Sequence, residues 1–126
     1  MKRNYLLFFS FLLLPSLIVM STTEKKSNQS HPIDLDGDFT VEKQRSLVIP
    51  IQTYLSDQSI EVNFSSSLGT IAIRIYDENE NIVYKKSVDT YSIQQIFINI
   101  TSFVEGVYTI EFVNSQNQYL SGNFKI

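Results

Sequence analysis

Apolar and polar residues alternate with a period of two along most of this chain, from Ile33 to Ile126. Successive side chains of a β-strand point to opposite faces, so this alternation is typical of strands with one buried face. No window in this region has the spacing of an amphipathic helix. After an opening pair at Ile33 and Leu35, strands are predicted at residues 47–52, 60–65, 70–76, 82–88, 96–100, 107–113 and 119–126.

The number and spacing of these segments predict the architecture. Seven or eight short strands, about ten to twelve residues apart and rich in β-branched and aromatic residues, are typical of an all-β antiparallel sandwich of two sheets. A small barrel is the alternative. Residues 77–81 are polar and join two alternating segments, which predicts a β-hairpin. Pro50 cannot donate to a strand ladder, so the strand at 47–52 is expected at a sheet edge or at a bulge.

The N-terminal segment has a different composition from the rest. Lys2 and Arg3 precede an apolar run from Tyr5 to Met20, and short residues follow it. This is the anatomy of a secretory signal peptide, and the run is short for a transmembrane helix. We therefore predict a signal peptide at residues 1–21, a flexible polar tether at 22–31 and a folded domain at 32–126. An uncleaved N-terminal anchor is the alternative. The domain is expected in the periplasm, at the cell surface or outside the cell.

Charge and cysteine content exclude several classes of function. Removal of the signal peptide takes away Lys2 and Arg3 and shifts the formal net charge from −3 to −5. An acidic domain is unsuited to binding nucleic acid or anionic lipid. The chain has no cysteine, which excludes disulfides, thiolate chemistry, cysteine-based zinc sites and lipoprotein attachment. We expect a soluble domain without membrane insertion after cleavage, stabilised by its apolar core alone.

Two groups of residues near the start of the domain resemble sites. His31 is the only histidine. A catalytic triad or a metal cluster needs its histidine held beside partner residues in a cleft, which is not expected in this polar lead-in to the domain. Asp34, Asp36 and Asp38 alternate around Gly37 and resemble the start of a calcium loop. In an EF-hand loop, however, the glycine follows the third acid. An acidic turn exposed to water is therefore the favoured interpretation, with calcium as the alternative.

Further candidates lie in loops and at outward strand positions. Asp77, Glu78 and Glu80 could act as acid and base in glycoside hydrolysis, but a hairpin loop offers water instead of a cleft that raises a pKa. We interpret them as a solubilising turn. Asn28, Asn63 and Asn99 begin triplets of the N-glycosylation pattern. The aromatic residues expected to face outward either pack across strands or contact a sugar or protein; they are Tyr54, Tyr91, Phe97 and Tyr119.

Four stretches of the domain resemble a known family. They are PIDLDGDF at 32–39, the hairpin at 73–84, the Gly-Val-Tyr strand within 105–112 and the ending at 119–126. They make the chain similar to domain of unknown function 3244, a family of small exported proteins of Bacteroides-type bacteria. The resemblance implies an immunoglobulin-like antiparallel β-sandwich of seven or eight strands, and it brings no catalytic residue and no cofactor. Phe39 stands where this family often has tryptophan.

The same stretches contain the residues expected to matter for the fold. Tyr108 follows Gly106 by two residues, which fits a tyrosine corner, where the ring is buried and the hydroxyl bonds to backbone. The full set of expected structural positions is Gly37, Gly106, Tyr108, Gly122 and Phe124.

These observations predict a non-catalytic exported binding or structural module. We expect its partner to be another protein of the cell envelope, contacted through an edge strand or through the face that carries Tyr54 or Phe97. The hairpin and the Gly-Val-Tyr strand also resemble the C-terminal sorting domains of a bacterial secretion pathway. A sorting or adhesin-like surface module is therefore the alternative, ranked second because only the short tether precedes the β region.

Overall fold

The computed structural model describes residues 29–38, 40–43 and 46–126. The predicted signal peptide and most of the predicted tether lie outside these residues. Within them, no helix is long and apolar enough to cross a membrane, and the regular structure consists of strands. The strands are β1 (His31–Ile33), β2 (Asp36–Gly37), β3 (Val41–Lys43), β4 (Ser46–Val48), β5 (Ile51–Leu55), β6 (Ser59–Phe64), β7 (Thr70–Tyr76), β8 (Ile82–Asp89), β9 (Gln95–Asn99), β10 (Val107–Val113) and β11 (Tyr119–Lys125).

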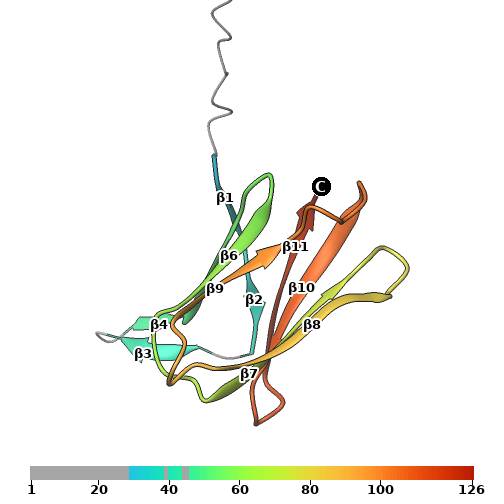
Figure 1. The fold of residues 1–126 in the computed structure, drawn as a ribbon. Helices are drawn as coiled ribbons and strands as arrows, with labels where there is room; N and C mark the ends of the chain where they lie inside the picture. The colour runs from blue at the N-terminus through green and yellow to red at the C-terminus, as the bar shows by residue number, and fades with distance from the viewer. Residues whose placement is uncertain (1–28, 39, 44–45) are drawn as a thin grey trace, which may run out of the picture.

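Two antiparallel sheets pack face to face as a β-sandwich (Figure 1). The four-stranded sheet has the order β1-β5-β6-β9, and the five-stranded sheet has the order β2-β11-β10-β7-β8. Strands β3 and β4 form a separate two-stranded ribbon. The sheets remain separate layers and do not close on each other, so the predicted sandwich is confirmed and the barrel is not formed.

Alternate residues of the long strands fill the space between the sheets. β7 buries Ile71, Ile73 and Ile75, and β6 buries every second residue from Ile60 onward. Each fully buried aliphatic or aromatic side chain stabilises the fold by roughly 1.5–3 kcal/mol relative to an exposed one. The buried apolar residues are Ile33, Ile51, Ile60, Val62, Phe64, Ile71, Ile73, Ile75, Val88, Ile96, Ile98, Ile100, Tyr108, Ile110, Phe112, Leu120 and Phe124.

Pro50 does not lie in an edge strand, and this corrects the prediction for residues 47–52. The chain forms two strands there, because β4 ends at Val48 and β5 begins at Ile51. β5 lies between β1 and β6, in the interior of its sheet. Pro50 lies in the gap between the two strands, and its carbonyl accepts hydrogen bonds from the amide and the hydroxyl of Ser65 at 2.9 and 3.0 Å. Without an N–H group the proline ends one strand before the next begins.

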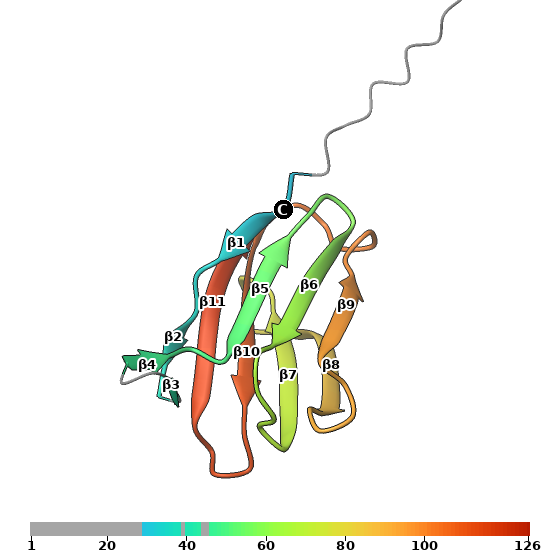
Figure 2. The ribbon, with the colours of Figure 1, turned by 90° about the vertical axis from the view of Figure 1, so that its left-hand side faces the viewer.

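Between β1 and β2 the chain crosses from the four-stranded to the five-stranded sheet (Figure 2). Two glycines permit this crossing because the backbones approach closely. A Cβ atom added at Gly122 would lie 2.5 Å from the carbonyl oxygen of Asp34. A Cβ atom added at Gly37 would overlap the carbonyl oxygen of Tyr119. The crossing therefore depends on both positions remaining glycine.

Candidate functional site

The histidine and aspartates at the start of the domain are not brought together into a site. His31 is exposed on β1, and Asp34, Asp36 and Asp38 are exposed along the crossing to β2. Asp36 pairs with Ser121 at the edge of the five-stranded sheet. In the part of the chain that the structure describes, no group of three His, Cys, Asp or Glu residues is arranged to hold a metal ion. The aspartates therefore line a water-exposed segment.

Asp77 organises the loop that joins β7 to β8. Its Oδ1 accepts hydrogen bonds from the amides of Asn79 and Asn81, both at 2.9 Å, and the side-chain amide of Asn81 donates to Oδ2 at 3.3 Å. The bond from the backbone amide of Asn81 is the main cause of the lowered pKa of Asp77, because hydrogen bonds to a carboxylate favour its ionised form. This carboxylate stabilises the turn.

Glu78 links the same loop to the start of β10. Its Oε1 accepts a hydrogen bond from the amide of Val107 at 2.8 Å. A Cβ atom at Gly106 would lie 3.1 Å from that oxygen, so glycine leaves room for the carboxylate. The carboxylates of Asp77 and Glu78 are thus bonded to backbone amides, which is a structural role. Glycoside hydrolysis instead needs an acid and a base on either side of a substrate.

Tyr108 has the geometry of a tyrosine corner. Its side chain is buried, and its hydroxyl donates a hydrogen bond to the carbonyl oxygen of Val104 at 2.6 Å. The ring packs between those of Phe103 and Phe124, with centroid separations of 5.2 and 5.5 Å. The contact fixes the loop before β10 against the core.

The four outward aromatic residues lie in three different places. Tyr91 is 72% exposed in the turn after β8, and Tyr119 is 46% exposed on β11. Tyr54 and Phe97 share the outer face of the four-stranded sheet, where Tyr54 is half-buried and Phe97 is 64% exposed. Tyr54 pairs with Glu61 on β6, and Glu61 pairs with Phe97 on β9. The two aromatic residues therefore flank Glu61, two strand spacings or about 10 Å apart.

Two side-chain amides hold the Glu61 carboxylate between these aromatic residues. Its Oε1 accepts hydrogen bonds from the amide nitrogens of Gln95 at 2.7 Å and Asn63 at 3.2 Å. The Gln95 amide nitrogen also donates to the Asn63 amide oxygen at 2.8 Å. Alternation in the sequence places Glu61 and Asn63 on one face, but it gives no indication that β9 brings Gln95 to them. We refer to Tyr54, Glu61, Asn63, Gln95 and Phe97 together as the platform.

The outer face of the five-stranded sheet has a different character. Arg74 and Glu111 form an ion pair there, with nitrogen and oxygen 3.7 Å apart. Lys85 pairs with Arg74 on the neighbouring strand, and Lys125 lies farther along the same face opposite Val107. Asp36 opposite Ser121 and Asp89 opposite Thr70 lie on this face as well, so it carries six charged residues, whereas the platform carries only Glu61.

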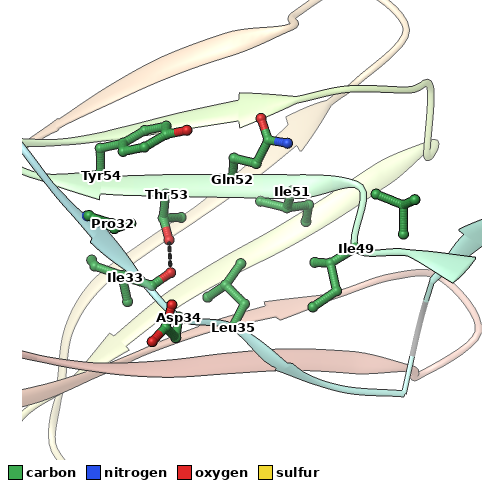
Figure 3. A pocket seen from close by; sticks show the side chains of 10 residues that line it. Pro32, Ile33, Asp34, Leu35, Ile49, Ile51, Gln52, Thr53 and Tyr54 are labelled. Atoms are coloured by element: carbon green, nitrogen blue, oxygen red, sulfur yellow. Dashed lines mark hydrogen bonds between the residues drawn. The ribbon is translucent and has the colours of Figure 1, made fainter.

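An open hollow lies beside the platform, where β1 and β4 diverge from β5. It has a volume of about 500 Å³, and Ile33, Leu35, Ile49 and Ile51 contribute apolar side chains to its lining. Figure 3 shows Tyr54 on one side of β5, while Thr53 on the other side points to β1. The Thr53 hydroxyl donates to the carbonyl oxygen of Ile33 at 3.0 Å. Among the described residues that line the hollow, Asp34 is the only carboxylate.

Two of the three possible glycosylation asparagines have side chains engaged in hydrogen bonds. Asn63 belongs to the platform. The side-chain oxygen of Asn99 accepts hydrogen bonds from the amide and the hydroxyl of Thr101 at 2.9 and 2.7 Å. Asn28 lies outside the described residues.

Comparison with known proteins places this fold in a family. A family model described as domain of unknown function (DUF3244) matches residues 32–126. The crystal structure, at 1.70 Å resolution, of a DUF3244 family protein with an immunoglobulin-like β-sandwich fold from Bacteroides vulgatus ATCC 8482 is similar to this chain, with a TM-score of 0.66 and 21% identity over 78% of this chain and 99% of that one. At this identity, the likeness shows the fold alone. No curated protein matches the chain. Since the family match extends over most of the sequence, this protein belongs to the DUF3244 family of immunoglobulin-like β-sandwich domains.

Proposed function

We propose that this protein is a non-catalytic exported binding module, and that its platform contacts another protein of the cell envelope. The observation that carries the proposal is the contrast between the two outer faces. The platform has one charge, held by two amides, on a chain with a formal net charge of −3. The centres of protein interfaces are depleted in charged residues and enriched in aromatic ones.

The hydrogen bonds of the platform also suit it to binding. Glu61, Asn63 and Gln95 restrain one another before any partner arrives. Binding therefore costs the platform less side-chain entropy than it would cost a surface of free side chains. Phe97 is 64% exposed, so its burial would remove apolar surface from water.

The chemistry of the platform favours binding over catalysis. Glu61 is its only carboxylate, Asn63 and Gln95 carry amides that neither donate nor accept a proton at neutral pH, and Tyr54 adds a single phenol. General acid–base catalysis needs a group that can transfer a proton and is placed at a reacting bond. The platform also lies on the open outer face of a sheet, whereas enzymes usually hold small-molecule substrates in concave sites.

The proposal is tested on protein complexes isolated from the cell envelope of the native host. The mature protein carrying Tyr54→Ser and Phe97→Ser is compared with wild type on native gels of envelope fractions. The control carries Ile82→Ser and Val104→Ser, which remove apolar side chains that are 53% and 76% exposed elsewhere. Wild type and control should migrate in one complex larger than two copies of the chain, and the platform variant should not. A complex that survives the platform changes, with folding verified by circular dichroism, would overturn the proposal.

Export is tested separately by the intact mass of the protein from the periplasm, the outer membrane and the medium. An unmodified mass for about residues 22–126 supports export with signal cleavage. A mass that retains residues 1–21 would contradict it. A mass that ends within β11 would favour the sorting-domain alternative.

A further inference from the structure

The four edge strands of the two sheets differ in their protection against pairing with another strand. β1 has three residues and includes Pro32, and β2 has two residues. β8 is longer, but it carries Lys85 and Lys86. Short length, proline and lysine are devices by which proteins block edge pairing. β9 has five residues, QIFIN, with no charge and no proline.

One row of backbone groups on β9 is open to a further strand. Among the described strands β9 pairs only with β6, and Figure 2 shows it at the margin of its sheet. At the start of β9 the amide of Phe64 donates to the carbonyl oxygen of Gln94 at 2.8 Å. Hydrogen bonding alternates along an antiparallel pair, so even-numbered residues of β9 face β6. The amide and carbonyl groups that point away from β6 are those of Gln95, Phe97 and Asn99.

We infer that a second copy of this chain pairs with this edge, β9 against β9, in antiparallel orientation about a two-fold axis at Phe97. In this register Phe97 lies opposite Phe97 of the second copy, and Gln95 lies opposite Asn99. Each of these residues has its backbone groups free on the outer side in both copies, so the same surface serves both partners, as two-fold symmetry requires.

Charge is the reason for choosing a second copy as the occupant. In a self-pairing strand, each residue meets residues of the same strand, so charged residues meet like charges. β9 carries no charge, and its self-pairing therefore brings no repulsion. Self-pairing of β8 would bring Lys85 and Lys86 of two copies close together.

This pairing joins two four-stranded sheets into one continuous sheet. The row from Tyr54 through Glu61 to Phe97 then continues into the same row of the second copy. The dimer presents two platforms side by side, and a partner with two matching segments would gain avidity. The inference goes beyond the proposed function and does not depend on it.

The dimer is expected to be weak. One five-residue strand from each copy forms the contact, so the buried area falls below the roughly 1,200–2,000 Å² of a standard interface. We therefore expect reversible association in the micromolar range or weaker, visible as a concentration-dependent mass in sedimentation equilibrium of the purified mature domain.

Substitution of Phe97, at the two-fold axis, by residues of opposite charge tests the register of the β9 pairing. Phe97→Lys and Phe97→Glu each place like charges opposite one another and remove the aromatic pair, so each should weaken dimerisation by about tenfold or more. An equimolar mixture of the two variants should restore a dimer. Tyr91→Lys, which changes a more exposed aromatic residue outside β9, is the control and should dimerise as wild type does. A wild-type monomer at all concentrations, or a dimer that both variants retain, would overturn the inference.

Cysteine cross-linking gives a second test that does not depend on the stability of the charged variants. The chain has no cysteine, so Phe97→Cys gives one thiol per copy. Opposite residues of a hydrogen-bonded antiparallel pair have Cα atoms about 5.5 Å apart, within the range of a disulfide. With oxidised glutathione, Phe97→Cys should form covalent dimers at least about tenfold faster than Tyr91→Cys. Equal rates would overturn the inference. Both tests use the purified domain, so dimerisation can fail while the complex with an envelope protein persists. Equally, the dimer can form where no complex with an envelope protein is found.

Discussion

Removal of one hydroxyl group at Tyr108 tests how much the tyrosine corner stabilises the domain. Tyr108→Phe retains the ring between Phe103 and Phe124 and removes only the donor of the 2.6 Å hydrogen bond to Val104. The substitution therefore leaves no cavity at the ring. Its effect on the free energy of unfolding reports the hydrogen bond.

The expected magnitude is about 1 kcal/mol, near the middle of the range of about 0.5–1.5 kcal/mol for the net contribution of a hydrogen bond. The larger penalty of a buried acceptor without a partner does not apply in full, because Val104 is 76% exposed and the hydrogen bond is only partly buried. For a domain of this size, 1 kcal/mol corresponds to a fall in Tm of roughly 4–8 °C.

The assay is thermal and urea unfolding of the mature domain, followed by circular dichroism. Tyr91→Phe is the matched control, because Tyr91 is 72% exposed and the loss of its hydroxyl should change the stability by less than about 0.5 kcal/mol. If Tyr108→Phe and Tyr91→Phe shift the urea midpoint equally, the corner does not stabilise the fold as described. Tyr108→Ala also removes the packed ring and should cost about 3–5 kcal/mol.

Four further substitutions test loops and close contacts. Glu80 has a φ of 63°, so Glu80→Gly should raise the free energy of unfolding by about 0.5–1 kcal/mol in urea, and a loss of stability would contradict the turn geometry. The pKa of Asp77 is lower in the folded protein than its ordinary value of 3.8. The ionised carboxylate therefore stabilises the fold at pH values above 3.8, and this stabilisation is lost as the pH falls through the pKa of the folded state. The Tm difference between wild type and Asp77→Asn should therefore shrink between about pH 5 and pH 2, and a constant difference would exclude this contribution. Gly122→Ala should cost about 3 kcal/mol, because its Cβ would meet the Asp34 carbonyl at 2.5 Å. Gly69→Ala is the control, because a Cβ atom there meets open space and only the φ of 75° opposes it. It should cost only about 1 kcal/mol. Equal urea midpoints for the two variants would refute the close approach of Gly122 to Asp34.

Alternation in the sequence predicted the long strands well, because each buries one face against the same core. Residues 70–76 were predicted as a strand with Ile71, Ile73 and Ile75 inward, and β7 has this arrangement. Phe97 was expected outward between Ile96 and Ile98, and the structure exposes it while burying both neighbours. Such local patterns depend only on which face of a strand meets the core.

The error at Pro50 shows what alternation cannot detect. A break between two extended segments leaves the period of two intact, so β4 and the start of β5 looked like one strand. The position of β5 inside its sheet depends on its pairing with β1, about twenty residues earlier along the chain, where Ile33 pairs with Thr53. Long-range pairing of this kind leaves no mark in a local pattern.

The platform was predictable only in part, for the same reason. Tyr54 and Phe97 were identified as outward aromatic residues, and Glu61 follows from the alternation of β6. Gln95 lies 34 residues from Glu61, and the two meet only because β9 returns beside β6. The contact between Glu78 and the amide of Val107 is likewise non-local.

The claim that the platform contacts another envelope protein is tested most directly by site-specific photo-crosslinking in living cells of the native host. Benzoylphenylalanine is introduced in place of Phe97 or, as a control, in place of Tyr91, since both are exposed aromatic residues. Irradiation should give the Phe97 protein a discrete adduct with a different protein, in addition to any adduct with a second copy of the chain, and should give the Tyr91 protein none. Identical adducts at both positions, or no adduct at Phe97 beyond a homodimer, would contradict the account.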